Sequence, residues 1–442
     1  MTRWTRVLLV ALLLAPPALT AQKLPTAAPA AVGVAAERLD RLHRGMQGFV
    51  DRHEVAGIVT LLARDGKVID VHAVGAQDEA ASRAMKTDTL FRIASMTKPI
   101  TSVAVMMLFE EGRFQLTDPI AKFIPSFKDM NVLTRNDAGA ETLVPARRPI
   151  TIRDLLTHRS GLTYGFIDRG PVGDAYRKGM VSDGLVTTEG TIGDNVDRLA
   201  QAPLVSQPGA EYHYSLGVDV LGRLVEVVSG TTFDAFLRDR IFKPLQMVDT
   251  AFDVPDAKWS RLATVYSPEG NGIRPMKDPE TFVTTNMSPG SYYKSPKKYF
   301  SGGAGLVSTA QDYSRFAQML LNGGELDGVR LLSPKTIQLM TTSHTSDLPA
   351  GSAGGPGANF GLGFRVVTDL GATQALGSEG SFGWSGIYGT TFWVDPKEKL
   401  VAIMMVQRYP GTPVAAAFQT LTYQAVTAMK EEARLPAVPG SR

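Results

Sequence analysis

At both ends of the chain, the spacing of hydrophobic and polar residues predicts one helix and a pair of strands. An amphipathic helix is expected where apolar residues recur at helical spacing, at Leu39, Leu42, Met46, Phe49 and Val50. Residues 57–63 and 68–74 are two β-rich runs, and Asp65-Gly66 lies between them. Because Asp-Gly favours tight hairpin turns, these runs are predicted to pair as antiparallel strands.

A similar pattern returns near the C-terminus. Residues 390–394 and 400–406 are β-rich and flank a polar turn, and a last helix is predicted within 413–430. The long stretch between the two ends has mostly helical apolar runs, and its segments 165–200 and 250–300 are rich in Gly, Pro, Asp and Ser and are predicted to be long loops. The expected fold is therefore α/β (α+β). An antiparallel sheet flanked by helices is built from residues 22–85 and 300–442, and a mainly helical domain with long loops is inserted at 86–299.

The first residues have the order of a signal peptide. Arg3 and Arg6 precede the apolar run 7–15, and Pro16, Pro17 and small residues follow. This run is shorter than the roughly 20 apolar residues that a membrane span needs. Residues 1–21 are therefore predicted to direct export to the periplasm or outside the cell, with no stable membrane anchor on the mature chain.

Composition narrows the possible functions. The 442 residues are 44% hydrophobic and 20% charged, the formal net charge is only +3, and the basic and acidic residues are interleaved, so nucleic acid is not an expected partner. The chain has no cysteine, which excludes disulfides, a thiol nucleophile and a cysteine-based zinc site. The oligomeric state is left open.

The pattern Ser-x-x-Lys, which can place a serine beside a lysine, occurs at Ser95–Lys98, Ser291–Lys294 and Ser295–Lys298. The last two lie in a polar, lysine-rich segment with no helical pattern. Ser95 instead opens a strongly apolar helical segment, so one turn puts Ser95 and Lys98 on one face. A desolvated lysine can serve as the base that a serine nucleophile needs, and a helix N-terminus offers free N–H groups to an oxyanion. An N-capping serine beside a surface lysine is the alternative interpretation.

Histidine is the competing base for a serine nucleophile. The chain has six histidines, but it lacks a Gly-x-Ser-x-Gly elbow, and no two histidines have the spacing of a zinc-binding helix. Surface or packed roles are therefore favoured for them, and no metal site or cofactor is predicted.

The segment 91–108 resembles the active-site helix of the serine β-lactamase and penicillin-binding superfamily. Four further segments resemble, in the expected order, motifs of its class C-like branch: 155–162, 208–215, 302–309 and 383–386. The resemblance implies a catalytic tyrosine at Tyr214, with Tyr212 as the second candidate, and a structural role for His158. It also implies an oxyanion hole made by the backbone N–H groups of Ser95 and Ile387.

Two departures from the lactamase pattern resemble the family VIII carboxylesterases. Tyr214-Ser215-Leu216 replaces tyrosine-x-asparagine, and Trp384-Ser385-Gly386 replaces lysine-threonine-glycine. Tryptophan cannot supply the cation that pairs with a lactam or peptide carboxylate, but it can form an apolar wall. Leu216 and 384–386 are therefore expected to contact substrate.

The resemblance implies a carboxylesterase that acts on small esters, of short acyl chain, through an acyl-enzyme on Ser95, with weak β-lactam hydrolysis as a side activity. A β-lactamase or D-alanyl-D-alanine peptidase is the alternative on the same fold. An acyltransferase and a non-catalytic penicillin-recognising protein are the remaining ones.

Overall fold

The computed structural model describes residues 23–136, 139–186, 189–282 and 285–430. The predicted signal peptide, residues 1–21, lies outside the described residues. In the part of the chain that is described, no helix is long and apolar enough to cross a membrane.

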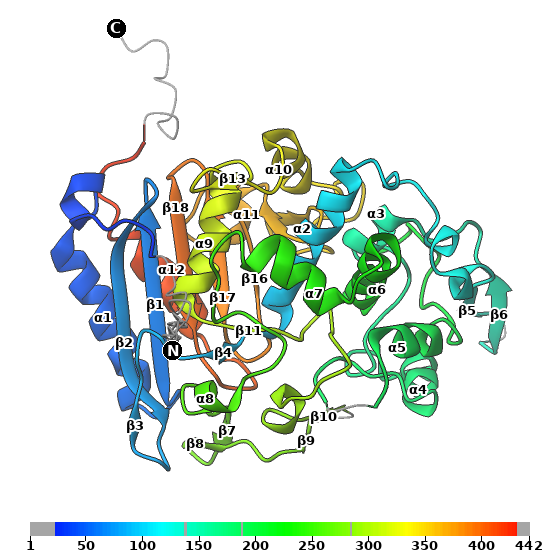
Figure 1. Cartoon of the computed structure of the whole chain (residues 1–442), viewed down its shortest axis with the longest axis horizontal. Helices are drawn as coiled ribbons and strands as arrows, with labels where there is room; N and C mark the ends of the chain where they lie inside the picture. The colour runs from blue at the N-terminus through cyan, green and yellow to red at the C-terminus, as the bar shows by residue number, and fades with distance from the viewer. Residues whose placement is uncertain (1–22, 137–138, 187–188, 283–284, 431–442) are drawn as a thin grey trace, which may run out of the picture.

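An eight-stranded antiparallel sheet is formed by the two ends of the chain, as predicted (Figure 1). Its strands, in sheet order, are β14 (Ala358–Phe360), β15 (Arg365–Val367), β16 (Phe382–Ser385), β17 (Thr391–Asp395), β18 (Leu400–Met405), β1 (Gly57–Arg64), β2 (Lys67–Asp78) and β3 (Arg83–Ala84). The ends of the chain meet where β1 pairs with β18, with Leu61 opposite Ile403. Every residue of β1 is buried, because both faces of the sheet are covered.

The β1–β2 hairpin forms because its turn residues tolerate a left-handed backbone. Asp65 has φ 54° and Gly66 has φ 73°, values that glycine and aspartate adopt more readily than most residues. The Asp-Gly prediction is confirmed, and the turn places Arg64 opposite Lys67 at the start of the β1–β2 pairing.

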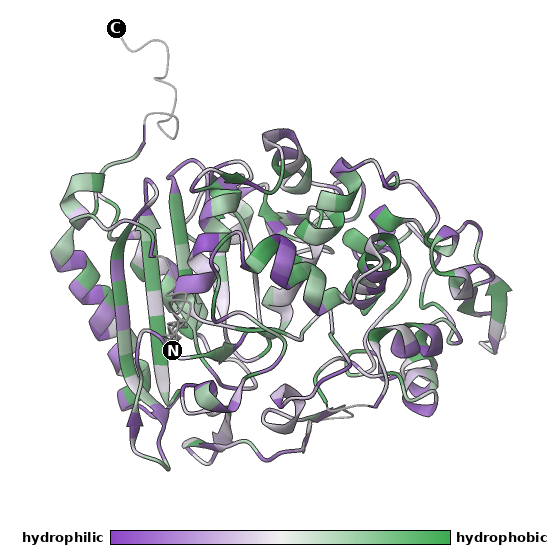
Figure 2. Ribbon diagram, viewed as in Figure 1, coloured by the Kyte–Doolittle hydropathy of each residue, from purple (hydrophilic) through white to green (hydrophobic). Residues whose placement is uncertain are grey.

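Helices α1 (Ala36–Asp51) and α12 (Val414–Tyr423) cover one face of the sheet, and α9 (Ala310–Leu321) covers the other. The predicted apolar stripe of α1 is buried, including Leu42 and Met46. Figure 2 shows hydrophobic colour along the central strands and hydrophilic patches on α1. The last helix is shorter than predicted, since α12 ends at Tyr423.

Residues 86–299 carry most of the described helices. They are α2 (Thr97–Glu110), α3 (Ile152–Leu156), α4 (Pro171–Lys178), α5 (Ile192–Leu199), α6 (Gly217–Ser229), α7 (Phe233–Leu237), which continues as a π-helix at Arg238–Phe242, and α8 (Asp256–Trp259). Several of them, α3 to α6, lie on the right in Figure 1. The prediction of a separate domain at 86–299 stays a prediction.

Two-stranded elements and short helices complete the fold. They are β4 (Phe91–Arg92) with β11 (Val307–Ser308), β5 (Asn131–Arg135) with β6 (Glu141–Pro145), β7 (Tyr266–Glu269) with β8 (Gly272–Pro275), β9 (Glu280–Phe282) with β10 (Thr285–Met287), β12 (Glu325–Leu326) with β13 (Val329–Arg330), α10 (Pro334–Met340) and α11 (Leu370–Thr373).

The prediction of long loops at 165–200 and 250–300 is wrong in part. The first segment contains α4 and α5, and the second contains α8, the β7–β8 hairpin and the β9–β10 hairpin. These elements were not predicted because they are short and partly exposed, so their polar residues give no clear apolar periodicity. Helix α5 has its own start signal, since Thr191 and Asp194 form a reciprocal capping box.

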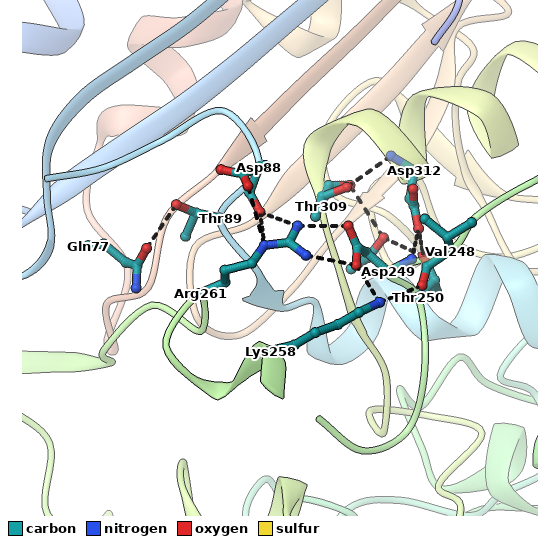
Figure 3. Close-up of polar contacts among 11 residues, drawn as sticks. Gln77, Asp88, Thr89, Val248, Asp249, Thr250, Lys258, Arg261, Thr309 and Asp312 are labelled. Carbon is teal, nitrogen blue, oxygen red and sulfur yellow. Dashed lines mark hydrogen bonds and ion pairs between the residues drawn. The ribbon is translucent and has the colours of Figure 1, made fainter. Parts of the chain in front are cut away.

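A polar network links the segment before the short strand β4 to the segment after its partner β11 (Figure 3). Arg261 donates to the Asp88 carbonyl oxygen at 2.6 Å and to the Asp249 carboxylate at 2.7 Å. The Asp249 N–H in turn donates to Asp312 Oδ2 at 2.7 Å, near the start of α9. Asp88 precedes β4 and Asp312 follows β11, so the network ties the segment that leads into Ser95 to the first turn of α9.

Candidate active site

Ser95 lies at a sharp junction between strand and helix. Strand β4 ends at Arg92, a 3₁₀ turn spans Ala94–Met96, and α2 begins at Thr97. Ser95 therefore lies in the turn that precedes the α-helix and is not its N-cap. Ala94 has φ 41°, a conformation that non-glycine residues rarely adopt and that is often found at functional sites.

Lys98 points from the first turn of α2 toward Ser95. Its side chain is only 1% exposed, and its Nζ lies 3.3 Å from Ser95 Oγ and 2.7 Å from the Gly303 carbonyl oxygen. The rings of Tyr214 and Tyr164 lie 4.5 and 5.1 Å from the same nitrogen. Lys98 is therefore not the surface lysine of the alternative interpretation.

Tyr214 brings its hydroxyl to the other side of Ser95. The phenol oxygen lies 2.7 Å from Ser95 Oγ, across 119 residues of sequence. The ring packs against His158, with centroids 4.8 Å apart, and against Trp384 at 5.6 Å. Tyr212 instead packs on His158 and Phe360. Of the two candidate tyrosines, Tyr214 is the one that contacts Ser95.

His158 is a buried support for this tyrosine segment. Its Nδ1 accepts the backbone N–H of Ser215 at 3.2 Å, so the proton of the neutral ring belongs on Nε2. Burial, together with the nearby positive charge of Lys98, holds the pKa of His158 well below its usual value. A neutral, enclosed histidine that contacts Ser215 matches the structural role that the resemblance implied.

Asp219 is a site residue that the sequence analysis missed, and Gly303 belongs to the motif segment 302–309 but was given no role there. The Asp219 carboxylate on α6 accepts from the Gly303 N–H at 3.0 Å, from Ser301 Oγ at 2.8 Å and from the Tyr299 hydroxyl at 3.1 Å. Burial raises the pKa of Asp219, and the hydrogen bonds and the charge of Lys98 oppose that rise. A signal was present in the sequence, because Asp219 is an acidic residue within the otherwise apolar run 216–222, five positions after Tyr214.

A cavity of about 770 Å³ opens at Ser95. Trp384, Ser385 and Gly386 of β16 and its following turn line it, together with Ile387 and Tyr214. Leu216, which was expected to contact substrate, is fully buried in the core and does not appear among the described residues that line the cavity. Its position just before α6 turns its side chain into the protein.

The end of β16 is pressed against the segment that carries Ser95. A Cβ at Gly386 would lie 2.4 Å from the Ile93 carbonyl oxygen, so only glycine allows this approach. The next turn is closed by a 2.9 Å hydrogen bond from the Gly389 N–H to the Gly386 carbonyl. Ile387 belongs to this turn, and both Ile387 and Ser95 line the cavity.

The other two Ser-x-x-Lys segments have different partners. The Ser291 hydroxyl donates to Asp278 at 2.9 Å, and the Ser295 hydroxyl donates to Asp253. These serines lie beside a separate cavity of about 540 Å³, which Lys294 and Lys298 also line. Both hydroxyls are directed to carboxylates, in contrast to that of Ser95.

The model of the family described as Beta-lactamase matches residues 42–425. The chain belongs to the β-lactamase family. Within the described ranges of this member of the family, no group of three or more histidine, aspartate or glutamate side chains could hold a metal ion.

Relatives and solved structures of this family cover nearly the whole chain. An uncharacterised Mycobacterium tuberculosis protein is 36% identical over 387 residues, which is 86% of this chain and 92% of the relative. Esterase EstB of Burkholderia gladioli is 32% identical over 410 residues, 90% of this chain and 98% of EstB. The structure of EstCE1, described as a hydrolase with promiscuous acyltransferase activity, has a TM-score of 0.76 and 29% identity, and covers 87% of this chain and 98% of EstCE1. This protein is a serine hydrolase of the β-lactamase fold.

Proposed function

We propose that this β-lactamase-family protein is a carboxylesterase that forms an acyl-enzyme on Ser95. The observation that carries the proposal is the position of Ser95 Oγ, 2.7 Å from the Tyr214 hydroxyl and 3.3 Å from Lys98 Nζ. A serine hydroxyl needs a neighbouring base to take its proton. An amine and a phenol within reach of the same oxygen can do this once one of them is deprotonated.

In the proposed reaction, Ser95 Oγ attacks the ester carbonyl carbon and loses its proton to the Lys98–Tyr214 pair. To accept this proton, one member of the pair must be deprotonated before the attack, either Lys98 as a neutral amine or Tyr214 as a phenolate. The oxyanion is stabilised by the backbone N–H groups of Ser95 and Ile387, each worth roughly 3 kcal/mol in the transition state. Tyr214 returns the proton to the leaving alkoxide, the alcohol departs, and water repeats the sequence on the acyl-serine to release the acid.

Preference for esters over lactams is supported by the wall of the cavity. Trp384 occupies the place where the lactamase pattern has a lysine, and its ring packs on Tyr214. EstB, which aligns with 90% of this chain, carries the name of an esterase. Acyl transfer is a second candidate, because an alcohol can replace water in deacylation and EstCE1 is described as having promiscuous acyltransferase activity. We further propose that residues 1–21 direct export.

The decisive experiment compares Ser95→Ala with wild type on p-nitrophenyl butyrate. We expect kcat/KM to fall about a thousandfold or more, because the nucleophile is lost. Ser291→Ala and Ser295→Ala are matched controls, since their hydroxyls bond to Asp278 and Asp253, and they should keep the wild-type rate. A p-nitrophenyl phosphonate should transfer its phosphonyl group to wild type, with release of p-nitrophenol, and add the mass of that group, but it should not modify Ser95→Ala. Full activity in Ser95→Ala would overturn the proposal.

The same preparations distinguish ester from lactam hydrolysis. We expect kcat/KM for p-nitrophenyl butyrate to exceed that for benzylpenicillin and nitrocefin at least a hundredfold, about 2.7 kcal/mol in transition-state binding. Equal values would identify a β-lactamase. Added butanol should divert part of the butyryl group to butyl butyrate if acyl transfer competes with hydrolysis.

A further inference from the structure

The catalytic cavity has a charged residue that the sequence analysis did not single out. Among the described residues that line it, Arg365 is the one that bears a charge at neutral pH, and none of them is acidic. Most of the remaining wall is made of aromatic rings, small side chains and hydroxyls, including Trp384, Trp393 and Ser381. The cavity is therefore a mostly apolar cleft with one cation.

The sheet places Arg365 in a cross-strand row with Trp393. Arg365 pairs with Gly383, and Gly383 pairs with Trp393, so the three positions form one cross-strand row. A side chain at Gly383 would collide with the neighbouring strand, because its Cβ would lie 2.2 Å from the Phe392 carbonyl oxygen. Glycine in the middle of the row leaves no side chain between the positions of Arg365 and Trp393 on this face of the sheet.

Strand β15 begins at Arg365, so the last residues of β16 have no described strand beside them on that edge. Its recorded pairs with β16 are Arg365–Gly383 and Val366–Phe382, whereas β17 pairs with β16 as far as Ser385. Beyond Arg365, the edge of Trp384 and Ser385 therefore has no strand beside it in the described sheet. Side chains alternate between the two faces along a strand, so Arg365 and Trp384 lie on opposite faces of the sheet. Both line the cavity that contains Ser95, so this cavity extends around the open edge, and an extended ligand can follow it.

The guanidinium is poorly compensated. Its Nε donates to the Gly354 carbonyl oxygen at 2.7 Å, and no hydrogen bond or ion pair to its terminal nitrogens is found in the described parts of the chain. Burial alone lowers the pKa of Arg365, with no nearby acid to oppose it. A partly buried cation without a counter-ion is costly, and an incoming carboxylate can offset that cost through two parallel N–H···O bonds.

We propose that Arg365 binds a carboxylate carried by the substrate, so that the preferred esters are amphipathic molecules with an acidic group remote from the scissile bond. The apolar walls take the hydrocarbon part, and the two terminal nitrogens of the guanidinium take the acid. This inference rests on the proposed esterase function. It names the substrate class that the cavity selects.

The test uses substrate pairs that differ in one charge. An acid on the acyl side is examined with mono-p-nitrophenyl adipate against p-nitrophenyl hexanoate. An acid on the leaving group is examined with 4-butyryloxybenzoate against its methyl ester. The selectivity ratio is kcat/KM of the acidic ester divided by kcat/KM of its neutral partner, and the pair with the higher ratio shows which side of the ester faces Arg365.

We expect Arg365→Met to lower the selectivity ratio of one pair at least tenfold, mainly through KM, because the carboxylate loses its partner. Arg365→Lys should restore part of the ratio, since it keeps the charge without the planar fork. Arg44→Met removes an exposed arginine far from the cavity lining and should leave the ratio as in wild type. Thermal melting of all variants checks folding.

The proposal is overturned if Arg365→Met leaves both ratios unchanged, or if it lowers kcat/KM for acidic and neutral esters equally. The outcome is separable from that of the proposed function. Loss of all ester hydrolysis in Ser95→Ala supports the esterase whatever the ratios are, whereas hydrolysis that persists in Ser95→Ala removes the esterase mechanism itself.

Discussion

Lys98 Nζ donates to the Gly303 carbonyl oxygen at 2.7 Å, a shorter contact than its 3.3 Å approach to Ser95 Oγ. The carbonyl thus fixes where the lysine nitrogen lies. The N–H of the same glycine donates to the buried carboxylate of Asp219, so α6 controls the position of Lys98 through one peptide segment. This link has a direct experimental consequence.

Asp219→Asn is expected to lower kcat on p-nitrophenyl butyrate about tenfold or more, or roughly 1.4 kcal/mol, with a smaller effect on KM. The amide keeps the shape of the side chain but removes its charge and one accepting oxygen, so the hydrogen bond that holds Gly303, and with it Lys98, becomes weaker. Asp40→Asn, at an exposed acid on α1, is the control. A purely structural role would lower the melting temperature and leave kcat per folded molecule unchanged, which would contradict the prediction.

Tyr214→Phe is expected to lower kcat by about a hundredfold or more, within the usual range for loss of a general acid–base group. Tyr212→Phe should have a much smaller effect, because the recorded contacts of Tyr212 are ring contacts with His158 and Phe360. Steady-state kinetics at several pH values measures both. If Tyr212→Phe proved the more damaging change, the assignment of the third catalytic group would pass to Tyr212.

Asp312 is expected to make stability depend on pH. Burial raises its pKa from 3.8 to about 7, and its Oδ1 accepts no hydrogen bond among the described residues. Between about pH 4 and pH 7 the folded state holds a proton that the unfolded state has released, so the stability contributed by this proton is lost as pH rises. Each pKa unit corresponds to about 1.4 kcal/mol, so the free energy of unfolding should fall by a few kcal/mol across this range.

Asp312→Asn mimics the protonated side chain and should remove this fall. The free energy of unfolding from urea titrations at pH 4.5, 6 and 7.5, compared between wild type and Asp312→Asn, measures it. The variant should gain stability over wild type as pH increases, whereas Asp40→Asn should not. Parallel curves for wild type and Asp312→Asn would show that Asp312 is ionised throughout, in the network of Figure 3.

Local signals in the sequence predicted the parts of the fold that depend on neighbouring residues. Asp65-Gly66 predicted the β1–β2 hairpin, and the spacing of Leu39, Leu42, Met46 and Phe49 predicted α1. Helices α4 and α5 were missed because each is eight residues long, too short for a clear periodic pattern. Their stability comes from capping and from packing against other elements.

By itself, the sequence determined the hairpins at the two chain ends and the nearness of Ser95 to Lys98, because hairpin turns and one helical turn act over a few residues. Only the tertiary structure decided which tyrosine reaches Ser95, that Gly303 and Asp219 hold Lys98, that Leu216 turns into the core, and that Arg365 lies in the cavity. These relationships join residues tens to hundreds of positions apart. Such contacts depend on how whole elements pack, and no local pattern of side chains specifies that packing.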